Sequence, residues 1–256
     1  MKRVILGFGM MAITCTQAHA TTSVDAQPQW ENLLERGDRL ARQSSARKRV
    51  QGANLMLRSY QMAPGKFRTL VAASRACMLR GFETKSSGRM RYWGERGWKL
   101  SKELIRRWPK RAQGYAWAAI HVGLIAKGSS HASVFFRGLH IQLEKMAKAA
   151  VKRNSLVYDG LGHRVLGRYY YRLPWPMRNL NKSLKHLRLA YILSPHDANG
   201  LLFYAETLWA KGKKRKARKI YRACGKLKLK HRLRNFVQVS GRDSILKCRI
   251  WLRKKR

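Results

Sequence analysis

The chain has 256 residues, of which 56 are Lys or Arg and 12 are Asp or Glu, so its formal net charge at pH 7 is +44. A charge of this size predicts an anionic partner. A solvated basic surface, shared with the rest of a basic proteome, is the alternative. No stretch after residue 20 is long and apolar enough to span a bilayer, and no two cysteines are spaced as in a zinc ribbon. These observations exclude an integral membrane protein of several spans and a small zinc-binding module.

The N-terminus has the pattern of a secretory signal peptide. Lys2 and Arg3 precede an apolar run over residues 4–13, and the small-residue triplet Ala-His-Ala follows at residues 18–20. We predict cleavage after Ala20 and a periplasmic or secreted protein, with association at a membrane surface left open. An uncleaved membrane anchor is the alternative, but the apolar run is only about half of the ~20 residues that cross a bilayer.

Beyond a polar leader at residues 21–29, the chain has the periodicity of helices. Apolar residues recur at helical spacing, the few prolines fall between these segments, and no alternating strand pattern is present. We predict an all-α repeat domain over residues 30–226 and basic capping helices over residues 227–256. The capping helices are expected at residues 228–237 and 244–254. On the second of them, the residues expected to face the preceding helices are Leu246, Ile250 and Trp251.

Small residues mark the first helix of each predicted helix pair, and in the first four pairs a proline or asparagine marks the end of the second. The ends recur at intervals of a few tens of residues, which indicates expanded repeats of one helical hairpin. In chain order, the first three pairs are defined by Leu40, Ala41 and Ser44 with Leu57, Tyr60 and Pro64, by Ala73, Ser74 and Cys77 with Leu104 and Pro109, and by Ala118, Ala119 and Val122 with Ala150 and Asn154.

The last two pairs carry the clearest pattern. The fourth has Leu166, Gly167 and Tyr170 followed by Ser183, Leu187, Ala190 and Pro195, and the fifth has Leu201, Tyr204, Ala205 and Leu208, the turn residue Gly212, and then Ala217, Tyr221 and Cys224. This pattern resembles the tetratricopeptide repeat (TPR), although Leu201 stands where Trp is usual and no proline closes the last unit. The resemblance implies an all-α solenoid of about five antiparallel helix pairs with a concave groove. A helical bundle without repeats is the alternative.

An insertion of Leu-Pro-Trp-Pro-Met at residues 173–177 lengthens the turn within the fourth pair. Tyr169, Arg172 and Trp175 crowd this turn, and consecutive tyrosines on a helix point about 100° apart, so we expect an exposed ring that stacks on a partner. Alternatively, Tyr170 and Trp175 close the corner between the two helices. The insertion before a TPR-like hairpin also resembles the T component of tripartite ATP-independent periplasmic (TRAP) transporters, which implies a solute-binding protein as partner.

The C-terminal fifth is the electropositive end of the chain. We predict that it attracts an acidic protein partner to the groove, and the alternative is a salt-sensitive polyanion: lipopolysaccharide, cell-wall polymer, phospholipid headgroups or nucleic acid. The sequence has no base-reading pattern, so sequence-specific nucleic-acid binding is not expected, and the oligomeric state stays open. The densest basic stretch contains Lys213, Lys214, Arg215, Lys216, Arg218 and Lys219.

The chain lacks the motifs of catalytic sites. It has no HExxH, no GxSxG and no phosphate-binding loop, so we expect neither enzymatic activity nor a cofactor or metal. His121 and His140 lie among apolar residues and are expected to be structural. Glu206, within an apolar helix, faces the groove or pairs with a nearby Lys or Arg. Cys224 and Cys248 are the expected disulfide, with unpaired buried thiols as the alternative.

Overall fold

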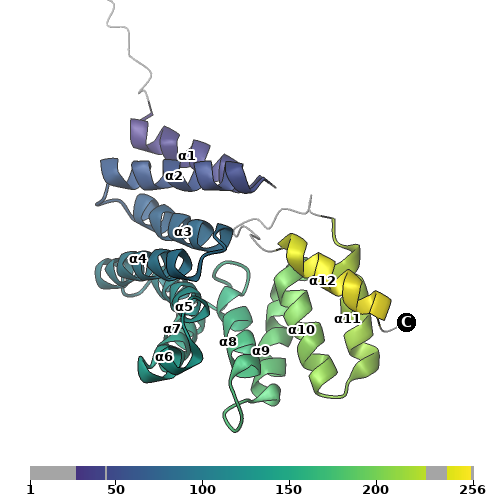
Figure 1. The fold of residues 1–256 in the computed structure, drawn as a ribbon. Coiled ribbons are helices and arrows are strands. Elements are labelled where there is room, and N and C mark those ends of the chain that lie inside the picture. The colour runs from purple at the N-terminus through teal and green to yellow at the C-terminus, as the bar shows by residue number, and fades with distance from the viewer. Residues whose placement is uncertain (1–26, 44, 229–240, 255–256) are drawn as a thin grey trace, which may run out of the picture.

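A computed structural model describes residues 27–43, 45–228 and 241–254 (Figure 1). Within these ranges the chain forms helices and no strand, which confirms the all-α prediction. The expected signal peptide, Ser44 and most of the first expected capping helix lie outside the described residues. No helix in the described ranges has both the length and the apolar character needed to cross a bilayer. The helices are α1 (Gln29–Ala41), α2 (Ala46–Met62), α3 (Phe67–Glu83), α4 (Ser87–Arg107), α5 (Ala112–Lys127), α6 (His131–Phe136), α7 (Leu139–Arg153), α8 (Leu161–Arg172), α9 (Leu180–Leu193), α10 (Ala198–Ala210), α11 (Lys214–Lys226) and α12 (Gly241–Lys254).

These helices form five consecutive antiparallel pairs and a closing helix, as the sequence predicts. We call the first helix of each pair its A helix and the second its B helix. The pairs are α1 and α2, α3 and α4, α5 and α7, α8 and α9, and α10 and α11. The short α6 lies within the third pair, and α12 packs on the last pair.

The stack of pairs is curved, with the A helices on its inner side. Each A helix contacts the A helix of the next pair, and α10 contacts α12 in the same way. The B helices make no comparably extensive contact with one another within the described part of the chain. Elements that touch along one side and diverge along the other produce a bent solenoid. Figure 1 shows this bend, from α1–α4 at the upper left, through α5–α9, to α10–α12 on the right.

Glycines stand where two helices approach too closely for a side chain. A Cβ on Gly37 of α1 would lie 2.9 Å from the carbonyl oxygen of Gly52 on α2, and a Cβ on Gly52 would lie 2.5 Å from that of Gly37. In the fourth pair, a Cβ on Gly167 would lie 2.4 Å from Cγ of the fully buried Leu187. The small residues of the repeat pattern are therefore required by helix packing.

Ion pairs join the A helices of neighbouring pairs. Arg75 of α3 bonds to Asp38 of α1, and Arg68 of α3 bonds to Glu31, which is also on α1. In the C-terminal half, Arg164 of α8 forms a buried ion pair with Asp197. Asp197 also caps α10, because its carboxylate accepts a hydrogen bond from the Asn199 backbone N–H at 3.0 Å. These carboxylates neutralise guanidinium groups where the inner helices come together.

The closing helix α12 is attached to the last pair by aromatic packing and by a disulfide. Trp251 stacks on Tyr221 of α11 with ring centroids 3.8 Å apart, and Cys248 is bonded to Cys224. The orientation expected for this helix is wrong in part. Leu246 is 56% exposed and Ile250 is 41% exposed, because the disulfide and the Trp251 stack direct a different face of α12 towards α11.

Candidate functional site

The helix α11 presents a broad basic face to solvent. Its apolar residues Ala217, Tyr221 and Cys224 are spaced by three and four positions and are buried against α10 and α12. With Ile220 and Gly225, which are also buried, they form one side of the helix, and the opposite side faces solvent. Six basic residues at the start of the helix and at its N-cap, all predicted to bind a partner, are exposed: Lys213, Lys214, Arg215, Lys216, Arg218 and Lys219.

The charge of this face is not neutralised by carboxylates of the chain. Neither α11 nor the turn before it contains an Asp or Glu, and the ion pairs found among the described residues involve none of the six side chains. Lys214 Nζ lies 5.8 Å from the ring centroid of Trp209, a cation–π geometry at the start of the helix. The face can therefore attract anions, and its position on a B helix puts it outside the inner curve.

Two of the three consecutive tyrosines in the fourth pair bind a carboxylate. The hydroxyls of Tyr169 and Tyr170 donate to Glu144 of α7 at 3.0 and 2.6 Å. Burial raises the pKa of Glu144, but the hydrogen bonds from Lys148 and from both tyrosines hold it below its ordinary value. Burial, followed by the bond to Glu144, raises the pKa of Tyr169. Tyr169 thus links the third and fourth pairs, and its hydroxyl is already engaged in the hydrogen bond to Glu144.

The inserted turn after these tyrosines projects from the molecule. Trp175 is 90% exposed, so it does not close the corner between α8 and α9, and that part of the interpretation is wrong. Tyr170, by contrast, is buried and stacks on His186 of α9. Arg172 is also exposed. The guanidinium of Arg178 lies 4.6 Å from the ring centroid of Tyr171, which holds the far side of the turn against α8. Of the residues predicted here, Trp175 and Arg172 are free to meet a partner.

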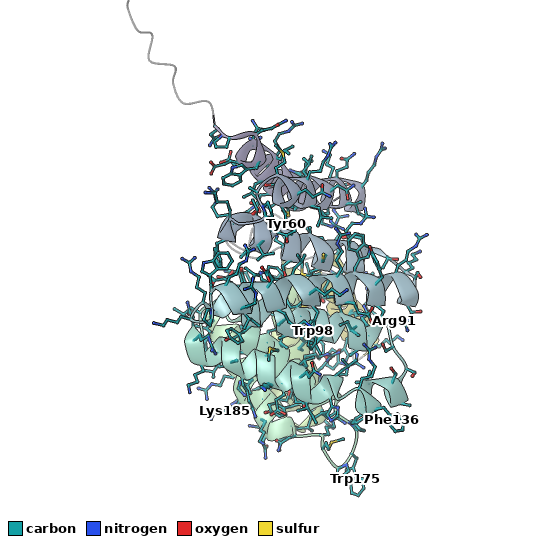
Figure 2. The ribbon with its side chains drawn as sticks, turned by 90° about the vertical axis from the view of Figure 1, so that its left-hand side faces the viewer. Tyr60, Arg91, Trp98, Phe136, Trp175 and Lys185 are labelled. Atoms are coloured by element: carbon teal, nitrogen blue, oxygen red, sulfur yellow. A yellow bond between two sulfur atoms is a disulfide. The ribbon has the colours of Figure 1, made fainter. Side chains whose placement is uncertain are left out.

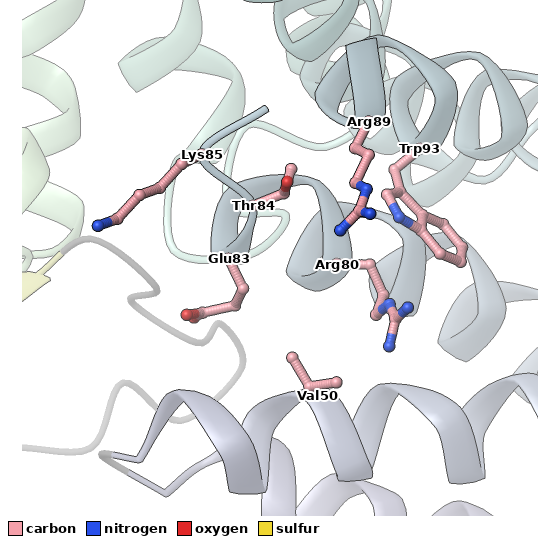
Figure 3. A pocket seen from close by; sticks show the side chains of 7 residues that line it. All are labelled: Val50, Arg80, Glu83, Thr84, Lys85, Arg89 and Trp93. Carbon is pink, nitrogen blue, oxygen red and sulfur yellow. The ribbon is translucent and has the colours of Figure 1, made fainter. Parts of the chain in front are cut away.

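A shallow hollow of about 340 Å³ lies where α2, α3 and α4 meet (Figure 3). The Arg80 guanidinium lies 4.9 Å from the ring centroid of Trp93, and Glu83 accepts a hydrogen bond from Arg49 Nε at 2.6 Å. The hollow thus offers cations and an indole, and its carboxylate is already bonded to an arginine. It is lined by Val50, Arg80, Glu83, Thr84, Lys85, Arg89 and Trp93.

The buried histidine of α5 is part of the core. His121 is fully buried, and its Nε2 lies 3.1 Å from Ser74 Oγ in a hydrogen bond. Burial lowers its pKa to about 3, so the ring is neutral. A second pair of rings joins α8 and α9, where His163 Nδ1 lies 3.0 Å from His186 Nδ1. In the described part of the chain, no three His, Cys, Asp or Glu side chains are grouped to hold a metal.

Glu206 forms an ion pair with an arginine, which is the second of the two expectations for it, whereas Phe136 is an exposed ring that the sequence does not indicate. Glu206 pairs with Arg168 of α8, so its partner lies on the preceding A helix. The same guanidinium lies 4.2 Å from the ring centroid of Phe203. Phe136, at the end of α6, is 92% exposed and was not predicted, because a helix of six residues gives little periodic signal. The adjacent Phe135 packs on His140, with ring centroids 4.5 Å apart.

No family model matches the chain, and no curated protein matches it. A solved structure does: a thermophilic TPR protein from Thermus thermophilus, with a TM-score of 0.63 over 86% of this chain and 99% of that one. The two sequences are 17% identical, so the similarity establishes the fold alone. The chain has a TPR-like fold of stacked helix pairs.

Proposed function

We propose that the protein is a non-enzymatic scaffold that binds an acidic protein segment along its inner face. The observation that carries this proposal is the uneven use of charge. On the inner helices Glu31, Asp38 and Glu206 are bonded to arginines. The cations at the start of α11 are exposed, and none of the ion pairs among the described residues involves them. An acidic segment would be drawn to the C-terminal end of the solenoid and docked on the A helices.

Export is part of this proposal, and it rests on the signal-peptide pattern of residues 1–20. A periplasmic or secreted scaffold would meet extracytoplasmic partners. The resemblance to the T component of TRAP transporters offers one such partner, a solute-binding protein. The acidic-segment proposal includes that case and does not require it.

The test is fluorescence anisotropy with a labelled peptide that alternates Glu with Leu, compared with a peptide in which Gln replaces each Glu. A variant with Lys213, Lys214, Lys216 and Lys219 changed to Gln should bind the acidic peptide at least about tenfold more weakly, because the charge that attracts the peptide to the C-terminal end of the solenoid is removed. The matched control changes Lys99 and Lys102 of α4 and Lys145 and Lys152 of α7 to Gln, which removes the same number of exposed charges from other B helices. Equal loss in both variants would show that net charge alone is responsible.

The same assay separates peptide capture from simple polyanion binding. Polyphosphate carries charge without apolar side chains, so its affinity should fall steeply as salt rises. The Glu-Leu peptide should retain much of its affinity in high salt if the inner face contacts its leucines. Identical salt dependence for the two ligands would favour a polyanion binder and contradict the scaffold proposal.

A further inference from the structure

The turns between A and B helices of the last three pairs lie along one edge of the molecule. Figure 1 shows α6, the turn from α8 to α9 and the turn from α10 to α11 along its lower edge. We call residues 128–138, 173–179 and 211–216 the A–B edge. Figure 2, turned about the vertical axis, shows Phe136 and Trp175 projecting from this edge.

The A–B edge exposes two large aromatic side chains almost completely. Phe136 is 92% exposed and Trp175 is 90% exposed. Single exposed apolar residues are common on soluble proteins. These two, however, occupy corresponding turns of consecutive pairs, and each turn is lengthened by an insertion. Exposing a large ring to water is unfavourable in free energy, and burying the ring in an apolar layer would remove that penalty.

The turn that carries Trp175 is held in shape by its own hydrogen bonds. The Arg178 N–H donates to the Pro174 carbonyl at 3.0 Å, and the Asn179 N–H donates to the Tyr170 carbonyl at 3.0 Å. The Asn179 side chain then caps α9 by accepting from the Lys182 N–H at 2.8 Å. The indole is therefore presented by an ordered support and needs little further ordering to bind.

Phe136 has an equally defined support. The Ser130 side chain caps α6 by accepting from the Ser133 N–H at 3.3 Å, and the Arg137 N–H donates to the Ser133 carbonyl at 3.0 Å. The guanidinium of Arg137 reaches Glu95 of α4, with Nη2 3.4 Å from Oε1. Phe135 packs inward while its neighbour Phe136 points out, so the exposed ring is a feature of a folded corner.

The charge of the A–B edge has one sign. None of its three segments contains Asp or Glu. Two of them contain an arginine shortly after the aromatic residue in the sequence, Arg137 directly after Phe136 and Arg178 three residues after Trp175. The third is the start of the basic face of α11, where Lys211, Lys213, Lys214, Arg215 and Lys216 are all exposed.

We propose that the A–B edge docks the protein on an anionic phospholipid bilayer, with Phe136 and Trp175 inserted at headgroup depth and the cations on lipid phosphates. Exposed aromatic rings combined with basic residues are the composition of interfacial membrane binding. Each cation near an anionic leaflet adds attraction that salt screens. The rings project from a convex edge, which suits a flat, deformable layer, whereas an extended peptide needs a groove or a sheet edge. This inference shares Lys213, Lys214 and Lys216 with the proposed function, but it depends on the two exposed rings, which that function does not use.

The test uses the chain from residue 21 onward, which keeps every described residue, and vesicles of phosphatidylcholine with or without phosphatidylglycerol. Sedimentation with vesicles should show binding only when phosphatidylglycerol is present. The variant Phe136→Ala/Trp175→Ala should partition at least about tenfold more weakly, since it loses the burial of two rings. Its far-UV circular dichroism should be unchanged because both rings are exposed. The matched control is Met62→Ala/Leu156→Ala, which removes exposed apolar residues from the end of α2 and from the turn after α7 and should bind as the unchanged protein does.

Insertion is distinguished from adsorption by lipids brominated on the acyl chain near the headgroup. Part of the tryptophan fluorescence should be quenched on binding, and Trp175→Phe should remove that quenching while most of the binding remains. Binding that is equal for both double variants and shows no quenching would overturn the proposal and leave charge adsorption. Equal binding to phosphatidylcholine alone, or none to either vesicle, would also overturn it. If the protein binds neither vesicle and Phe136→Ala/Trp175→Ala binds the acidic peptide more weakly than the unchanged protein does, the edge would be assigned to a protein partner.

Discussion

A single methyl group added to Gly97 of α4 should destabilise the protein. The Cβ of an alanine there would lie 2.2 Å from Cε1 and 2.3 Å from Nδ1 of His121, so the imidazole would have to shift by roughly 1 Å to restore ordinary contact. The ring cannot move freely, because it is fully buried, bonded to Ser74 and stacked near Trp117 with centroids 6.2 Å apart. Losing the hydrogen bond costs about 1 kcal/mol, overpacking costs about 1–3 kcal/mol, and the helix propensity of alanine returns about 1 kcal/mol. We expect Gly97→Ala to lower the free energy of unfolding by about 2 kcal/mol.

Urea denaturation followed by far-UV circular dichroism and by tryptophan fluorescence measures this change. Gly88→Ala is the matched control in the same helix, because its added Cβ would meet only Ser86 Oγ, at 3.9 Å; it should be neutral or stabilised by up to about 1 kcal/mol. Adding His121→Ala to Gly97→Ala removes the clash. The double variant should therefore lose less free energy of unfolding than the sum of the losses in the two single variants. Equal midpoints for Gly97→Ala and Gly88→Ala would refute the packing argument.

Three further perturbations test other contacts. Asp197→Asn should cost about 3–5 kcal/mol, because it leaves the buried guanidinium of Arg164 beside a neutral side chain; adding Arg164→Met should recover part of the loss in urea melts. Burial lowers the pKa of His121 to about 3, so as the pH falls below about 6.5 the unfolded chain binds a proton on this imidazole while the folded chain does not. The free energy of unfolding should therefore be highest above about pH 6.5 and should fall as the pH is lowered towards 3. In His121→Gln this fall should be shallower. Cys248→Ser should cost about 3 kcal/mol under oxidising conditions, from the 24-residue separation of the disulfide, and reductant should remove the difference from the unchanged protein.

The helix pairs could be predicted from sequence because their determinants are local. Helical periodicity, the turn at Gly212, where φ is +75°, and small residues such as Ala205 and Ala217 are all readable over a few turns. Gly167 was identified by the same pattern, although its partner Leu187 lies on the next helix. Short-range spacing therefore carries most of the information about a solenoid, in which each unit contacts only its neighbours.

The remaining features depend on contacts between units. Glu206 bonds to Arg168, 38 positions away, and no local spacing identifies such a pair. The exposed side of α12 is set by the Trp251 stack on Tyr221, and so Leu246 faces solvent against expectation. Trp175 is hydrophobic and flanked by prolines, which favours a buried corner, but the turn closes through backbone hydrogen bonds and leaves the ring outside.

The placement of carboxylates has opposite consequences for folding and for binding. In a chain of net charge +44, cation repulsion opposes the compact state. Asp38 and Glu206 relieve it between the A helices, but no ion pair among the described residues neutralises the cations at the start of α11. Salt screens repulsion between exposed charges as well as attraction to a ligand. Raising the salt from about 0.05 to 0.5 M should therefore raise the urea midpoint while weakening the binding of anionic vesicles and of polyphosphate. Because specific anions can bind the folded state, sodium chloride and sodium fluoride should be compared. A urea midpoint that falls in both salts would show that attraction between cations and carboxylates outweighs repulsion among cations in the folded chain. The exposed cations of α11 would then not lower the free energy of unfolding.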